Sequence, residues 1–147
     1  MVKATFSISL HLNFLNSLYS LYTMSETYLL WGKSTWTLLH TLAARIDDAS
    51  YKKLKSELHR LFLTICSNLP CPECTRHARD FIKIVRLDTV SNKQLFRSML
   101  YQFHNNVNKR IGKPVYNMED IVVYEKYNLM VVFKTISLFM QKDTIVL

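Results

Sequence analysis

The sequence predicts an all-α protein, a four-helix bundle with a short fifth helix, and three observations carry this prediction. The chain has 147 residues, of which 49% are hydrophobic, and this suits one domain with a core. Only 2 Gly and 3 Pro are present, so long elements with few tight turns are expected. Apolar residues recur at helical spacing in several segments, and no internal repeat is visible.

The first two helices are predicted over residues 34–46 and 51–69. The apolar face of the first holds Trp36, Leu39, Leu42, Ala43 and Ile46, and that of the second holds Leu54, Leu58, Leu61, Phe62, Ile65 and Leu69. Between them, Asp47, Asp48 and Ser50 break the pattern and offer an N-cap. Pro70 ends the second helix, because the residue before a proline avoids helical geometry.

The third helix is predicted to start at Pro72, because a proline in the first turn lacks only an N–H that would be unpaired anyway. Its apolar residues are Phe81, Ile82 and Val85.

A capping-box pattern, "SNKQ" over Ser91–Gln94, opens the fourth helix. The apolar residues of that helix are Leu95, Met99, Phe103, Val107 and Ile111, and Gly112 and Pro114 close it. Residues 118–140 are predicted to be helical, with Asn117 as a cap. The runs "IVVY" and "MVVF" favour strand locally, but partner strands for a sheet are missing.

Residues 1–24 are predicted to be an N-terminal extension, disordered or an upstream mis-start, ahead of a single domain over residues 25–147. The extension is moderately apolar, but His11, Asn13 and Asn16 interrupt it. This makes it too polar for a membrane span and only a weak signal peptide, and a membrane role stays open. Met24 then begins "MSETYLLWG", which resembles a natural start.

The net charge of +8 implies attraction to anions such as nucleic acid, an acidic membrane, an acidic protein or a phosphorylated cofactor. No run of five or more like charges occurs, which argues against a nucleic-acid-binding tail.

The stretch "LPCPECTRHA" carries a CxxC pair, Cys71 and Cys74, with three possible roles. A zinc site would add His77, but zinc needs four ligands and the sequence holds no second CxxC. Alternatively, the two cysteines are incidental and share no chemical role. A redox dithiol is favoured, because Pro70 and Pro72 place the pair at a helix start, where free N–H groups stabilise a thiolate. A thioredoxin-like frame would need a βαβ unit, and none is predicted.

A second cluster of polar and aromatic residues could supply the electron acceptor that such a dithiol needs. His40 or Trp36 alone would more often be a core residue. Asn105 and Asn108 are less easily dismissed, because asparagine is a poor helix former and a buried amide needs partners. Together with His104, Lys109 and Lys113 they form a polar, basic face. Such a face suits a flavin dinucleotide, and also single-stranded nucleic acid.

Three ordered motifs, "WGKSTWTLLHTLAA", "LPCPECTRHA" and "FHNNVNKRIGKPVY", resemble those of the Erv/ALR family of FAD-dependent sulfhydryl oxidases. The resemblance spans about residues 28–127, and the short stretch around the CxxC is especially similar to the small members from large DNA viruses.

The resemblance implies a thiol oxidase with FAD held in the helical bundle. Cys71 would exchange with substrate thiols, Cys74 would lie against the flavin, and electrons would pass to oxygen and give hydrogen peroxide. The implied FAD contacts are Gly32, Lys33, Trp36, His40, His77, His104, Asn105, Val107, Asn108, Lys113 and Tyr116. The implied partners are a protein dithiol, such as a thioredoxin-like carrier, and a second copy in a homodimer, with no nucleic acid. A viral member would work in the host cytoplasm or the virion. The rival prediction is a redox-inactive or zinc-binding helical adaptor.

The chain departs from the family pattern at several positions. Many members carry a second, shuttle dithiol, whereas here only Cys66 remains, and it is expected to be buried and inert. If it is not inert, it could form an intermolecular bridge. Met99 stands where the family usually has tryptophan, and the family's cysteine near Asn117 is absent.

Overall fold

The computed structural model describes residues 30–143, with side chains as far as residue 137, and every regular element in that part of the chain is helical. This confirms the predicted all-α class. The described residues fall into two units, which divide between Lys33 and Ser34. The predicted extension over residues 1–24 lies outside the described residues. Within those residues, no helix is both long and apolar enough to cross a membrane.

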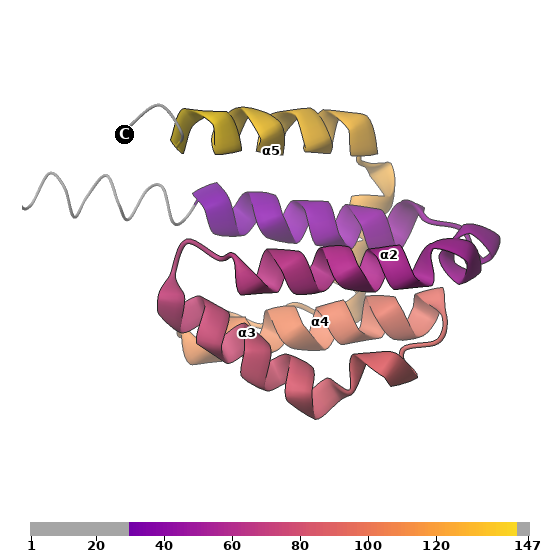
Figure 1. Cartoon of the computed structure of the whole chain (residues 1–147), viewed down its shortest axis with the longest axis horizontal. Helices are drawn as coiled ribbons and strands as arrows, with labels where there is room; N and C mark the ends of the chain where they lie inside the picture. Colours follow the sequence, from indigo (N-terminus) through magenta and orange to yellow (C-terminus); the bar gives the residue numbers. More distant parts are fainter. Residues whose placement is uncertain (1–29, 144–147) are drawn as a thin grey trace, which may run out of the picture. The chain divides into compact units, whose positions relative to one another are not determined.

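Four helices build one core in the second unit. They are residues 34–45 of the first helix, which covers residues 30–45, with α2 (Asp48–Ser67), α3 (Pro72–Val85) and α4 (Lys93–Arg110). Figure 1 shows α2 running back alongside residues 34–45 of the first helix. The buried core consists of Leu39, Ala43, Tyr51, Leu58, Phe62, Cys66, Ala78, Val90, Phe96, Met99, Leu100 and Phe103. All four helices contribute to it, as the predicted apolar faces require. The prediction was wrong for Leu54, Leu95 and Ile111, which are exposed.

Two helix starts follow the local chemistry that the sequence predicts. The Asp47 carboxylate accepts a hydrogen bond of 2.8 Å from the Ser50 N–H, so Asp47 is the N-cap of α2. Pro72 occupies the first turn of α3, as predicted. Both signals act within one turn of the chain, so they do not depend on distant contacts.

The predicted capping box at the start of the fourth helix is wrong by one residue. The helix begins at Lys93, and Asn92, not Ser91, is its N-cap. The Asn92 side-chain oxygen accepts a hydrogen bond of 2.9 Å from the Leu95 N–H. Asparagine and serine cap helices about equally well, so adjacent candidates cannot be ranked by residue type.

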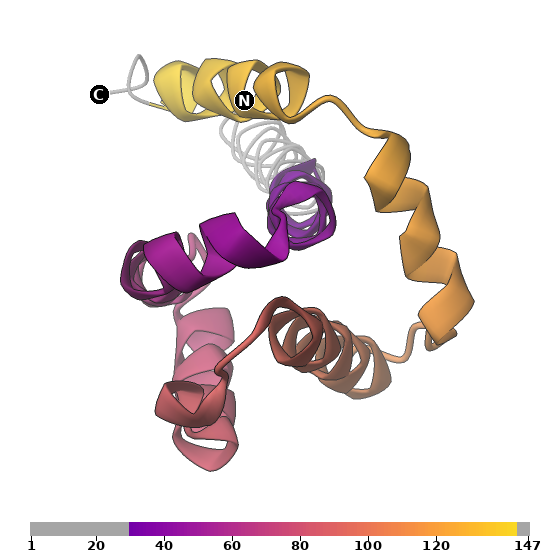
Figure 2. The same cartoon turned by 90° about the vertical axis from the view of Figure 1, so that its right-hand side faces the viewer.

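The helical stretch predicted over residues 118–140 is two elements. A 3₁₀ helix, η2 (Met118–Lys126), precedes α5 (Leu129–Asp143), and Figure 2 shows η2 as the orange segment between α4 and α5. The break occurs at Asn128, whose side-chain oxygen accepts a hydrogen bond of 3.0 Å from the Met130 N–H and caps the start of α5. A fifth helix is therefore present, but it begins later than predicted.

Candidate active site

The two cysteines of the CxxC pair are joined in a disulfide at the start of α3. Their Cα atoms are 5.1 Å apart. Cys71 is the N-cap and lies ahead of the helix, and its sulfur accepts a hydrogen bond of 3.2 Å from the Cys74 N–H. Cys74 lies in the first turn. The two sulfurs therefore have different surroundings, and Cys71 takes the position where helix N–H groups favour a negative charge.

Cys74 shares a face of α3 with residues of the core. Ala78 and Phe81 follow it by four and seven residues, which is helical spacing on one face. Ala78 is 1% exposed, and the Phe81 ring stacks on that of Phe103 in α4, with centroids 4.5 Å apart. The Cys74 side of α3 is thus the side that packs against the bundle.

A cluster of aromatic and imidazole rings begins at Phe103. The Trp36 ring meets Phe103 edge-on at 5.2 Å and stacks face to face on His104, with centroids 4.0 Å apart and an interplanar angle of 6°. His40 and His104 are 3% and 6% exposed, and Nε2 of His40 lies 3.0 Å from Nδ1 of His104. The structure therefore joins three of the predicted residues from two helices.

Both histidines of this pair are neutral near pH 7. Burial, with the nearby His104 and Arg97, lowers the pKa of His40 to about 3. Burial and the Lys113 ammonium lower the pKa of His104 to about 4. Neutral imidazoles offer a ring face and one free nitrogen rather than a charge, which suits stacking against a flat polar ligand.

Two tyrosines cover this histidine pair. Tyr124, in η2, stacks on His40 with ring centroids 4.8 Å apart and an interplanar angle of 18°. Tyr116 lies edge-on to His104 at 4.9 Å. Sequence reasoning included Tyr116 and missed Tyr124. The only signal for Tyr124 was an aromatic residue among valines, in a segment without a clear period.

Of the other predicted residues, Asn108 on α4 is 5% exposed. Val107 packs against the core cluster. Lys113 lies near enough to affect the pKa of His104. The Asn105 side chain instead binds the main chain of Tyr116.

His77 lies one turn after Cys74. Its Nε2 bonds to Nη2 of Arg76 at 2.9 Å, while its Nδ1 is buried and has no partner. The Thr41 hydroxyl is also buried without a partner, and this residue was not predicted. Gly32 and Lys33 belong to the first unit, so the structure describes them apart from the other predicted residues.

The remaining cysteine, Cys66, is 1% exposed in the core, and burial raises its thiol pKa to about 12. Within residues 30–143, no group of three or more His, Cys, Asp or Glu side chains is arranged to hold a metal ion. Met99 is 4% exposed and fills core space where the resembling family usually has tryptophan.

The fold and the site define a class: a helical-bundle protein with a CxxC disulfide and a buried cluster of rings. The model of the Erv1/Alr family matches residues 33–128, and the chain belongs to this family.

Relatives of this chain are named FAD-linked sulfhydryl oxidases. An African swine fever virus protein named FAD-linked sulfhydryl oxidase is 34% identical over 97 residues, covering 65% of this chain and 81% of the relative. The rice FAD-linked sulfhydryl oxidase ERV1 is 33% identical over 85 residues, covering 58% of this chain and 43% of the relative. The chain therefore spans less than half of the rice protein. The yeast Erv1 core structure superposes with a TM-score of 0.53 at 25% identity, covering 67% of this chain and 84% of that structure.

Proposed function

We propose that this protein is an FAD-linked thiol oxidase that forms disulfides in partner proteins. Electrons would enter at the Cys71–Cys74 disulfide, pass to FAD and end on oxygen, which gives hydrogen peroxide. The observation that carries the proposal is that disulfide, placed at the start of a bundle helix. Family membership and relatives named FAD-linked sulfhydryl oxidases support it.

The residues around the histidine pair fit a flavin dinucleotide. Two buried polar atoms without partners, Nδ1 of His77 and the Thr41 hydroxyl, are groups that a polar ligand would satisfy. The Lys113 cation suits phosphate. The proposed contacts are Trp36, His40, His77, His104, Val107, Asn108, Lys113 and Tyr116. The Asn105 side chain binds the Tyr116 main chain instead, and Gly32 and Lys33 rest on the sequence alone. Bound FAD would accept two electrons from the dithiol and release them to oxygen.

The cysteines perform the exchange with substrate. A substrate thiolate attacks the sulfur of Cys71, the Cys71–Cys74 bond breaks, and its electron pair goes to Cys74 as a thiolate. A second substrate thiolate then attacks the substrate sulfur of the mixed disulfide, which releases Cys71 as a thiolate. The two substrate protons go to solvent or to the cysteines. The α3 N-terminus helps this step, because its N–H groups stabilise negative charge on Cys71.

The proposal extends to partners and place. The chain holds three cysteines and one of them is buried in the core, so electrons would enter directly from a separate dithiol protein, such as a thioredoxin-like carrier. A homodimer is proposed from the family resemblance. The similarity to a viral relative supports work in the host cytoplasm or the virion.

Absorbance and oxygen uptake of the purified chain test the proposal. We expect a bound flavin spectrum and oxygen consumption with dithiothreitol. Cys74→Ser should keep the flavin and lose turnover, and Cys66→Ala is the matched control that should keep both. Bound zinc without flavin would favour an adaptor, and turnover retained by Cys74→Ser would refute the role of that cysteine.

A further inference from the structure

Asn105 and Tyr101, on α4, both bind the main chain of Tyr116. The Asn105 side-chain oxygen accepts from the Tyr116 N–H at 2.9 Å, and its amide N–H donates to the Tyr116 carbonyl at 2.9 Å. The Tyr101 hydroxyl donates to the same carbonyl at 3.0 Å. Three hydrogen bonds thus fix one residue of the segment that follows α4. We name this arrangement of Tyr101, Asn105 and Tyr116 the Tyr116 clamp.

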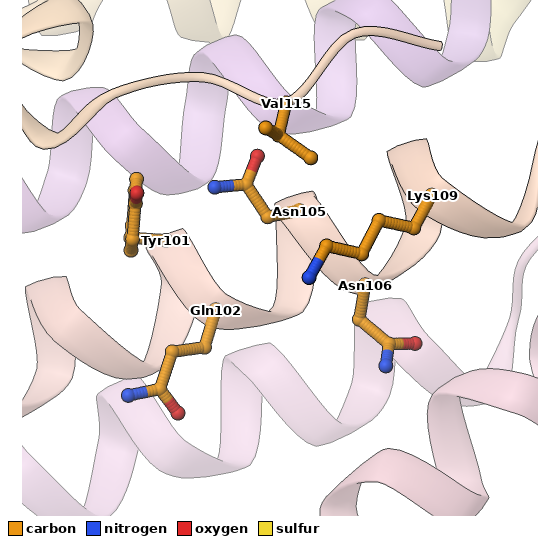
Figure 3. A pocket seen from close by; sticks show the side chains of 6 residues that line it. All are labelled: Tyr101, Gln102, Asn105, Asn106, Lys109 and Val115. Atoms are coloured by element: carbon orange, nitrogen blue, oxygen red, sulfur yellow. The ribbon is translucent and has the colours of Figure 1, made fainter. Parts of the chain in front are cut away.

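The clamp borders a surface depression of about 350 Å³, lined by Tyr101, Gln102, Asn105, Asn106, Lys109 and Val115. Figure 3 shows Asn105 directed toward the segment that carries Val115, with Tyr101 beside it, while Asn106 points elsewhere. Asn105 uses one oxygen lone pair and one N–H on the Tyr116 main chain, and these two bonds fix the direction of its amide.

The clamp connects to the ring cluster through Tyr116. Residues 111–120 are all exposed, so few packing contacts hold the Tyr116 ring in place. That ring nevertheless lies 4.9 Å from His104, which stacks on Trp36 and is bonded to His40. The hydrogen bonds of the Tyr116 clamp therefore determine the position of the Tyr116 ring against His104.

We propose that Asn105 and Tyr101 are positioning residues, which act on the cofactor only by holding Tyr116 against His104. This rests on the proposed function, because the site must bind FAD for the position of Tyr116 to matter. It differs from the prediction of a direct Asn105 contact. A positioning residue and a direct ligand give different energetic coupling to Tyr116.

A double-mutant cycle on FAD affinity separates the two roles. In the full chain, Asn105→Ala should weaken FAD binding about tenfold, measured by flavin fluorescence titration. In a Tyr116→Ala background the same substitution should cost less than about twofold, since there is no ring left to position. Equal factors in both backgrounds would show a direct contact and overturn the proposal.

Hydrogen exchange at the Tyr116 amide gives a second readout, independent of turnover. Asn105→Ala should speed this exchange, because the N–H loses its acceptor. Tyr101→Phe removes one bond to the Tyr116 carbonyl without a cavity, so it should fold and weaken FAD binding about two- to threefold. Asn106→Ala is the matched control, the same residue type one position along, and should change neither readout.

The outcomes distinguish the two proposals. If the wild-type chain binds no flavin, the proposed function is refuted, and the positioning role of Asn105 and Tyr101 is refuted as well. If the wild type binds flavin and Asn105→Ala keeps both its affinity and its Tyr116 exchange rate, only the positioning role fails.

Discussion

His40 and His104 are 64 residues apart in the sequence, yet Nε2 of His40 lies 3.0 Å from Nδ1 of His104 in a buried hydrogen bond. One ring donates its N–H and the other accepts with a lone pair, which requires the accepting nitrogen to be unprotonated. Protonation of the accepting nitrogen would point two N–H groups at each other and break the hydrogen bond. The pair therefore makes the protein sensitive to acid.

We expect the free energy of unfolding to fall as the pH drops below 6.5. The pKa of His40 is about 3 in the folded chain against 6.5 ordinarily, so between these values the unfolded state binds a proton that the folded state does not. Above pH 6.5 both states are neutral and this effect vanishes. The loss from His40 is up to about 1.4 kcal/mol per pH unit.

Urea unfolding at pH 6.5 and pH 5 measures this loss. His40→Gln should have a smaller slope with pH than the wild type, although it is less stable at pH 7. His59, whose pKa is also lowered by burial and by Lys55, contributes in the same direction and stays in both proteins. An unchanged slope in His40→Gln would contradict the assignment.

Tyr124→Ala should weaken flavin retention by about three- to tenfold. Its ring stacks on His40 at 4.8 Å, and aromatic pairs of this kind contribute about 0.5–1.5 kcal/mol. The ratio of flavin to protein absorbance after gel filtration measures the loss. Tyr127→Ala is the control, since that ring contacts Tyr124 and is 39% exposed. Equal losses in the two variants would remove the special role of Tyr124.

Asn92→Ala should lower the free energy of unfolding by about 1 kcal/mol, the usual cost of losing an N-cap. Ser91→Ala, one residue earlier, should cost much less, because the structure places its side chain outside the cap. Thermal unfolding of both variants checks the corrected helix start. If Ser91→Ala cost more stability than Asn92→Ala, Ser91 would be the N-cap, as the sequence pattern predicted.

The helices could be predicted from the sequence where a local signal sets them. Asp47 and Pro72 mark helix starts by chemistry within one turn. Apolar spacing found part of each core face, but it also selected residues that are exposed, such as Leu54 and Leu95. The break at Asn128 was missed, although asparagine is a common N-cap, because the valine-rich runs around it gave no clear period.

The site was predictable as a set of residue types but not as contacts. His40 and His104 were both chosen, yet their mutual hydrogen bond depends on how the first helix and α4 pack. Asn105 was chosen for its amide, but its partner is a main-chain group, and main-chain partners leave no mark in the pattern of side chains. Tyr124 entered the site through η2, whose 3₁₀ geometry the sequence did not indicate.

Cys66 should stay unreactive in the folded protein. It is 1% exposed, and burial raises its pKa to about 12, so almost no thiolate forms at neutral pH. After reduction, a maleimide should label Cys71 and Cys74 in the native state and reach Cys66 only after unfolding. Mass spectrometry of the labelled peptides measures this. Native labelling of Cys66, or a Cys66-linked dimer, would refute its buried role.

Arg97→Ala should destabilise the attachment of η2. The Arg97 guanidinium lies 3.0 Å from the Glu125 carboxylate, and Arg45 donates to the Glu125 carbonyl at 3.2 Å, so two arginines hold the residue beside Tyr124. Arg97 is only 20% exposed, which makes this ion pair less screened than one at the open surface.

The expected loss for Arg97→Ala is about 1 kcal/mol in urea unfolding, together with faster hydrogen exchange in η2. Lys83→Ala is the control, because its pair with Asp80 is 3.7 Å long and both side chains are mostly exposed. That control should cost less than about 0.5 kcal/mol. If the two variants lose the same stability and η2 exchange is unchanged, the arginines do not hold Tyr124 over His40.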